Sequence, residues 1–153
     1  MIEIKEAKEK DLPGLAKMYK HAFQLHNLFE KPEEEVLKYL QNLHTKFTII
    51  VAVHEEEVVG GCVVVVRVDT DIHKLSQIKH VAVADEYQDK SVGTELMKKA
   101  EEIIGKGKVE LHIASTKDDA VGFYKNLGYE VEGELKSHYR RDETCVLVGK
   151  ILE

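Results

Sequence analysis

The stretch VAVADEYQDKSVGTELMKKA, residues 81–100, decides the fold because it passes abruptly from a strand into a helix. Alternating apolar residues end at Val83, and Val92, Leu96 and Ala100 then recur on one helical face. In such a turn several backbone N–H groups and the positive end of the helix dipole converge on one point, which suits phosphate or diphosphate. The common nucleotide loops G-x-G-x-x-G and G-x-x-x-x-G-K-[ST] are absent. By spacing alone, a purely structural turn explains the stretch equally well.

Working outward from this turn, hydrophobic periodicity predicts the order strand, helix, helix, three strands, helix, strand, helix and two strands. FTIIVAV and VVGGCVVVVRV flank the acidic turn HEEE and indicate a β-hairpin. The sequence contains no linker, repeat or low-complexity segment. We therefore expect a single α/β domain over residues 1–153.

Composition excludes several classes of protein. The 22 Lys and Arg against 28 Asp and Glu give a net charge of −6, which argues against a general nucleic-acid binder. The longest apolar run, VVGGCVVVV, is shorter than the roughly 20 residues that span a membrane, and the N-terminus lacks a secretion signal. We expect a cytoplasmic protein without membrane or nucleic-acid partners. Cys62 and Cys145 are expected to be buried free thiols, and no residue spacing indicates a metal site.

A second motif, AVGFYKNLGY at residues 120–129, narrows the choice of family. It fits A-x-x-[FL]-Y-x-x-x-G-[FY] in full, and QDKSVG at residues 88–93 fits [QR]-x-x-G-x-[GA] except that Ser91 replaces the middle Gly. With the order of elements, these motifs resemble the GNAT superfamily of acyl-CoA-dependent N-acetyltransferases. The resemblance implies a mixed, mostly antiparallel sheet of about seven strands, with about four flanking helices. A central parallel pair of strands would splay apart to hold coenzyme A.

The resemblance also implies which residues bind acetyl-CoA. The turn amides would hold the diphosphate, and Val83 would bond the pantetheine. The expected cofactor-binding residues are Val81, Ala82, Val83, Gln88, Asp89, Lys90, Ser91, Val92, Gly93, Thr94, Lys117 and Tyr124. At Ser91, either a dihedral that suits only Gly causes strain of about 1 to 3 kcal/mol, or ordinary helix entry lets the hydroxyl contact phosphate. Lys117 stands where many members have Asn, and either pairs with a phosphate or is solvated.

Acetylation of an amine requires a neutral amine, a polarised thioester carbonyl and a proton for the departing thiolate. Tyr124 falls on the family tyrosine that acts as general acid, although an amphipathic core tyrosine is the alternative. His112 faces away from Leu111 and Ile113 in its strand. From residue 109 onward the chain is most similar to ribosomal-protein-type and other protein N-terminal acetyltransferases, which place Glu or His at this position as base. A hydrogen-bonded structural histidine is the alternative.

Three further residues are candidates for substrate contact. Gln77 stands where histone-type members carry a catalytic Glu, and it is not itself a base. Tyr139 lies in KSHYRRDE, a segment similar to the tyrosine-bearing hairpin over the peptide site of protein N-terminal acetyltransferases. It matches a tyrosine of that hairpin, or is simply an exposed loop residue. Phe29 is an exposed aromatic candidate in the loop LHNLFEKP.

These observations predict an acetyl-CoA-dependent N-acetyltransferase without a metal, acting by direct attack in a ternary complex. The favoured acceptor is a protein or peptide N-terminal α-amine, whose pKa of about 8 suits a histidine base. The amide of Val83 would support the oxyanion. A small-molecule acetyltransferase for polyamines or other metabolites is one alternative. Another is a catalytically weak CoA-binding regulatory module, which the departures at Ser91, Lys117 and Gln77 would favour. We expect a monomer or a homodimer.

Overall fold

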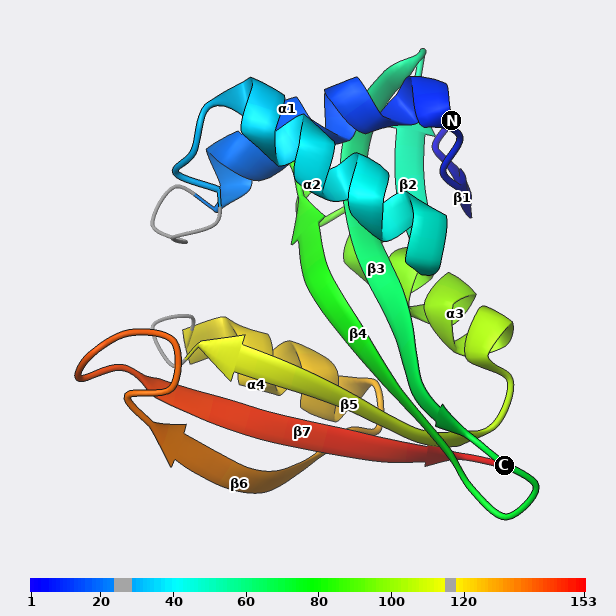
Figure 1. Ribbon diagram of the computed structural model, residues 1–153, viewed down its shortest axis with the longest axis vertical. Coiled ribbons are helices and arrows are strands. Elements are labelled where there is room, and N and C mark those ends of the chain that lie inside the picture. Colours follow the sequence, from blue (N-terminus) through cyan, green and yellow to red (C-terminus); the bar gives the residue numbers. More distant parts are fainter. Residues whose placement is uncertain (24–28, 115–117) are drawn as a thin grey trace. The chain divides into compact units, whose positions relative to one another are not determined.

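The computed structural model describes residues 1–23, 29–114 and 118–153, and this part of the chain forms seven strands and four α-helices (Figure 1). In chain order they are β1 (Glu3–Glu6), α1 (Leu12–Ala22), α2 (Glu33–Lys46), β2 (Thr48–His54), β3 (Glu57–Asp69), β4 (Lys74–Val83), α3 (Val92–Ile104), β5 (Gly107–Ala114), α4 (Asp118–Asn126), β6 (Glu130–Lys136) and β7 (Thr144–Leu152). Two short 3-10 helices, η1 (Glu9–Asp11) and η2 (Asp85–Tyr87), precede α1 and α3. The order expected from the sequence is confirmed.

The strands form a mixed sheet in the order β1-β2-β3-β4-β5-β7-β6. The pairs β1–β2, β2–β3, β5–β7 and β6–β7 are antiparallel. Strands β4 and β5 run parallel, and their register extends from Leu75 with Lys108 to Gln77 with Glu110. The expected mostly antiparallel sheet with one parallel pair is confirmed.

The chain divides into two compact units, which are described separately. The first comprises Met1–Val65 and His80–Ile103, and the second comprises Val66–Lys79 and Ile104–Glu153. The division cuts through β3 and β4, so each of these long strands contributes to both units.

In the first unit, helices cover both faces of β3. An added Cβ at Gly61 would meet Leu15 and Tyr19 of α1, whereas one at Gly60 would meet Val92 and Leu96 of α3. Because neighbouring residues of a strand point to opposite faces, α1 and α3 lie on opposite sides of the strand. The adjacent glycines let both helices approach the sheet closely.

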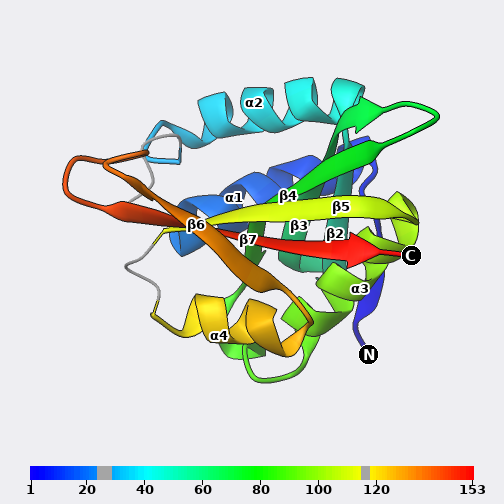
Figure 2. The same cartoon turned by 90° about the horizontal axis from the view of Figure 1, so that it is seen from below.

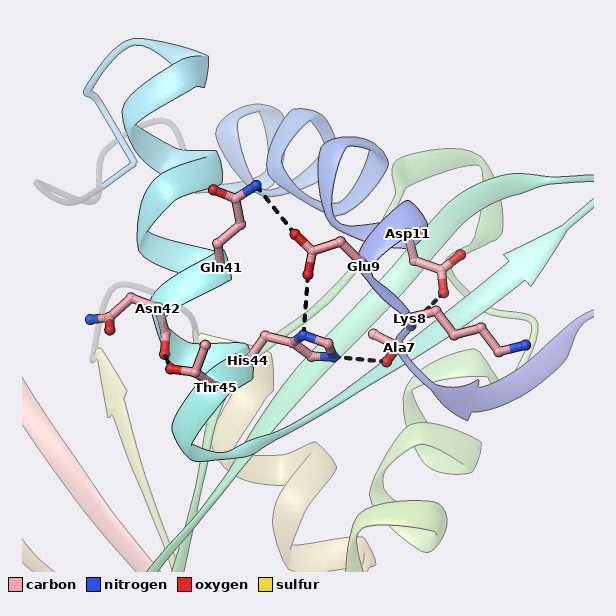
Figure 3. A network of polar contacts seen from close by, with 8 residues as sticks. All are labelled: Ala7, Lys8, Glu9, Asp11, Gln41, Asn42, His44 and Thr45. Atoms are coloured by element: carbon pink, nitrogen blue, oxygen red, sulfur yellow. Dashed lines mark hydrogen bonds and ion pairs between the residues drawn. The ribbon is translucent and has the colours of Figure 1, made fainter.

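Helix α2 packs against α1 and β2, and a polar network fixes its C-terminal part to the segment before α1 (Figure 3). His44 Nε2 donates to the carbonyl of Ala7 at 3.1 Å, and His44 Nδ1 lies 3.6 Å from the carboxylate of Glu9. Gln41 bonds the same carboxylate at 3.5 Å. Asp11 accepts the backbone N–H of Lys8 at 2.8 Å, which fixes the chain at η1.

In the second unit, β5 pairs with β7 along its full length, from Gly107 with Leu152 to Ala114 with Cys145. Strand β6 pairs with the other edge of β7, and α4 packs against β6 and β7 (Figure 2). Lys150 Nζ donates to the carbonyl of Leu127 at 2.7 Å and so ties β7 to the end of α4.

Cys62 and Cys145 are buried and free, as the sequence analysis expected. Burial raises the pKa of the Cys62 thiol to about 12, so this side chain remains a neutral core residue. Within the described ranges, no helix combines the length and the apolarity needed to cross a membrane.

Two glycines where the chain passes from α3 into β5 allow a test of the packing in the second unit. Both have left-handed backbone, with φ of 82° at Gly105 and 97° at Gly107. An added Cβ at Gly107 would collide with the carbonyl oxygen of Lys74, whereas one at Gly105 would meet nothing within 4 Å. We expect Gly105→Ala to lower the free energy of unfolding by about 1 kcal/mol, from backbone strain alone. Gly107→Ala should lower it by about 2 to 4 kcal/mol, as measured by denaturant unfolding. Equal losses would contradict the close approach of Gly107 to β4.

Candidate active site

The turn after β4 is held at both of its ends. Ala84 directly follows the last residue of β4, and its N–H donates to the carbonyl of Val59 on β3 at 2.8 Å. The side-chain amide of Gln88 donates back to the carbonyl of Val83 at 3.2 Å. The first residue of the QDKSVG motif thus closes the turn onto the end of β4.

The turn itself uses two residues with left-handed backbone, Asp89 with φ 65° and Ser91 with φ 63°. The carbonyl of Ser91 accepts the N–H of Glu95 at 3.0 Å, which is the first hydrogen bond of α3. The leading N–H groups of a helix have no partner within it. The N–H groups of Val92, Gly93 and Thr94, at the start of α3, are therefore suited to bind an anion. For Ser91, the structure agrees with the strained alternative and not with ordinary helix entry.

The side chains of Tyr87 and Lys90 make further contacts at this turn. The hydroxyl of Tyr87, directly before Gln88, is hydrogen-bonded to His54 Nδ1 on β2 at 2.9 Å. Lys90 Nζ lies 5.7 Å from the centre of the Tyr87 ring. The turn therefore has a cation beside it and an anchor to the sheet.

In the second unit, His112 lies on β5 with its side chain half-buried, between the buried residues Leu111 and Ile113. Its expected position on the face opposite to theirs is confirmed. Its Nδ1 is 3.1 Å from the hydroxyl of Tyr139, and its ring centre is 5.9 Å from that of His138. The structure thus brings His112 and Tyr139 together, although Tyr139 is 48% exposed.

The surroundings of His112 favour its neutral form. Burial lowers its pKa most, and the neighbouring His138, Arg67 and Lys79 lower it further, whereas Glu110 acts in the opposite direction. A histidine with a lowered pKa is unprotonated at neutral pH, which is the state that a general base requires.

Gln77 is 3% exposed and lies on β4. Its side-chain oxygen accepts hydrogen bonds from Arg67 of β3, from Nε at 2.8 Å and from Nη2. Sequence reasoning missed Arg67 because it treated VVGGCVVVVRV as a hairpin strand only. The sequence signal that could have found Arg67 was a single Arg in a run of β-branched residues. Such an Arg indicates a side chain that has a polar partner.

Tyr124, on α4, is 7% exposed. Its ring centre lies 5.0 Å from that of Phe123 and 6.0 Å from that of Tyr129. This packing holds the ring in place and is compatible with either the catalytic or the core interpretation.

The expectation of an exposed Phe29 is wrong. Its side chain is 1% exposed and packs among rings from α1, α2 and β4. The ring centres of Tyr19 and Phe23 lie 5.2 and 5.1 Å from its own. The loop thus places this aromatic residue in the core of the first unit, because burying the ring removes a large apolar surface from water. Lys117 lies outside the described residues.

Among the described side chains, no group of three or more His, Cys, Asp or Glu residues is arranged to hold a metal ion. The arrangement instead offers helix amides to an anion in one unit and a neutral histidine in the other.

Comparison with known proteins identifies the family. Residues 45–131, more than half of the chain, match the acetyltransferase (GNAT) domain. The chain therefore belongs to the GNAT acetyltransferase family, and the expected class of enzyme is confirmed. No curated protein sequence matches the chain.

Several solved structures share the fold. Ribosomal-protein-alanine N-acetyltransferase from Brucella melitensis has a TM-score of 0.77 at 24% identity, covering 98% of this chain and 99% of that one. NAA60 from Arabidopsis thaliana, in complex with a bisubstrate analogue, has a TM-score of 0.81 at 17% identity, covering 100% and 99%. A phosphinothricin acetyltransferase from Sinorhizobium meliloti, in complex with acetyl-CoA, has a TM-score of 0.79 at 15% identity, covering 99% and 88%. These likenesses confirm the expected GNAT fold.

The left-handed backbone of Ser91 generates a prediction. Ser91→Gly removes the steric cost of this conformation, so we expect the variant to bind acetyl-CoA at least as tightly as the parent in calorimetry. Ser91→Ala is the matched control, because it keeps a Cβ in the strained position and removes only the hydroxyl. Affinity that falls by about 0.5 to 1.5 kcal/mol in both variants would instead show that the hydroxyl binds phosphate.

Proposed function

We propose that this chain transfers the acetyl group of acetyl-CoA to a primary amine, with the N-terminal α-amine of a protein or peptide as the leading acceptor. Membership of the GNAT family supports the reaction. The observation that carries the choice of acceptor is the half-buried His112, whose lowered pKa keeps it neutral. An α-amine with a pKa of about 8 can be deprotonated by such a base, whereas a lysine-type amine with a pKa of about 10.4 is a poorer match.

The contact between His112 and Tyr139 is compatible with the tautomer that this role needs. A neutral imidazole has one N–H and one acceptor nitrogen. If Nδ1–H donates to the Tyr139 oxygen, Nε2 carries the lone pair and is the nitrogen that takes a proton. In this proposal Tyr139 is a positioning residue, which holds the ring with its basic nitrogen free.

The proposed reaction is a direct transfer. His112 takes a proton from the amine, directly or through water, and the amine nitrogen attacks the thioester carbonyl carbon. The N–C bond forms, the C–S bond breaks, and the amide of Val83 supports the oxyanion between these events. Tyr124 gives its phenolic proton to the CoA thiolate. The products are an N-acetylated amine and free CoA.

On the cofactor, we assign the diphosphate to the amides at the start of α3. The observations that support this are the left-handed turn and the position of Val92, Gly93 and Thr94 at the start of α3, where N–H groups have no partner within the helix. Lys90 adds a positive charge beside them.

The general test combines acetyl-CoA calorimetry with a thiol-release assay over a panel of amines. The panel contains short peptides with free N-termini, the same peptides with blocked N-termini and a single lysine, and polyamines. Turnover with free N-termini is expected. Turnover with polyamines alone would favour the small-molecule alternative, and binding without turnover would favour a CoA-binding regulatory module.

The two proposed proton carriers are expected to respond differently to pH. Tyr124→Phe keeps the ring and its packing, so acetyl-CoA affinity should change little while kcat falls by about 10²-fold or more at every pH. His112→Ala should be most defective at low pH, because raising the pH toward the amine pKa supplies neutral amine without a base. The measurement is kcat/KM against pH for the parent and both variants.

Tyr139→Phe is the matched control for His112. It leaves the imidazole in place and removes only its hydrogen-bond partner, so its defect should be smaller than that of His112→Ala and share its pH dependence. A His112→Ala profile that runs parallel to the parent at all pH values would remove His112 from the mechanism.

A further inference from the structure

The second unit carries a polar face that the proposed reaction only partly uses. We use this name for the face formed by Arg67 on β3, Gln77 and Lys79 on β4, Glu110 and His112 on β5, and Tyr139 after β6. The reaction employs His112 and Tyr139. The reaction gives no role to the charged residues of this face, Arg67, Lys79 and Glu110.

Strand register places these side chains on one side of the sheet. Gln77 pairs with Glu110 across the parallel strands β4 and β5, so the two point to the same face. Lys79 and His112 each follow two residues later on the same strands and share that face. Arg67 reaches it by donating to the side-chain oxygen of Gln77.

Neither Arg67 nor Lys79 forms an ion pair with a carboxylate of the described residues, although Glu110 shares their face. Arg67 is bonded to the neutral amide of Gln77. The two cations repel each other. Burial lowers the pKa of Lys79, and the charge of Arg67 lowers it further. Two like charges held together beside a catalytic base are unfavourable unless an anion joins them.

We propose that the acceptor amine carries a carboxylate close to its amino group, and that Arg67 and Lys79 bind this carboxylate. The inference deepens the proposed function and depends on it. The guanidinium retains N–H donors that Gln77 does not use, and Arg matches the two oxygens of a carboxylate in a bidentate manner. Glu110, whose charge acts on His112, supplies the complementary negative group for an incoming ammonium. The polar face therefore fits a zwitterion and disfavours a polyamine.

Two acceptors share this chemistry. One is a peptide whose first residue is acidic, which places a side-chain carboxylate near the α-amine. The other is a free amino acid, which places its own α-carboxylate there. The test distinguishes them by using matched pairs in which only the charge changes.

The experiment measures kcat/KM by thiol release with the purified full chain. The peptide arm compares Glu-Ala-Ala-Ala amide with Gln-Ala-Ala-Ala amide, and the amino-acid arm compares alanine with alaninamide. In at least one arm the anionic member should be preferred by about tenfold or more, the scale of a charge-assisted hydrogen bond. The arm that shows the preference identifies the source of the carboxylate.

Variants locate the preference on the polar face. Arg67→Gln and Lys79→Gln should each reduce the preference, which is the ratio of kcat/KM for the anionic acceptor to that for its neutral partner, to within about threefold. Arg67→Lys keeps the charge without the bidentate geometry and should restore part of it. Lys106→Gln, an exposed residue between α3 and β5, is the matched control for loss of one positive charge and should leave the preference unchanged.

The outcomes distinguish failure of the carboxylate-binding inference from failure of the proposed acetyltransferase function. Turnover of amines without preference for the anionic member, or with preference for a cationic one, would overturn this inference and leave the proposed function standing. A preference that survives both Arg67→Gln and Lys79→Gln would overturn the assignment to this face. No turnover with any amine would overturn the proposed function and this inference with it.

Discussion

The structure depends on one backbone constraint, which is that the chain must leave β4 and enter α3 within a few residues. It meets this constraint with left-handed backbone at Asp89 and Ser91 and with the Gln88 side chain closing onto Val83. The same geometry exposes the leading amides of α3 to an anion. Helix α3 also needs a small residue beneath it, and Gly60 on β3 provides the space. In our proposal, the strained backbone of Ser91 accompanies a turn whose amides bind the diphosphate of acetyl-CoA.

The second unit shows how strand register assembles chemistry from residues that are distant in sequence. Parallel pairing aligns Gln77 with Glu110, and a two-residue period carries that alignment on to His112. The buried residues Leu111 and Ile113 fix which face His112 occupies, because a slip by one residue would bury the imidazole and expose the core. In our proposal the hydrophobic pattern of β5 therefore determines the position of the base.

Much of this was predictable from sequence, for identifiable physical reasons. The order of elements and the face of His112 followed from periodicity, which reflects burial directly, whereas the parallel pair was expected from the resemblance to the GNAT superfamily. The burial of Phe29 did not follow, because a loop residue reveals its partners only when α1 and α2 are packed. Arg67 was missed because its partner, Gln77, is joined to it through the pairing of strands and not through a motif. The backbone of Ser91 had two open alternatives, and only the dihedral angle separated them.

The central claim is that the amides at the start of α3 hold the diphosphate of acetyl-CoA. Amide chemical shifts in a nitrogen-15 NMR titration test it most directly, with CoA compared against pantetheine, which lacks the diphosphate and the nucleotide. We predict large shifts at Ser91, Val92, Gly93 and Thr94 with CoA and small ones with pantetheine. CoA binding that leaves these amides unshifted, or equal shifts with both ligands, would contradict the account.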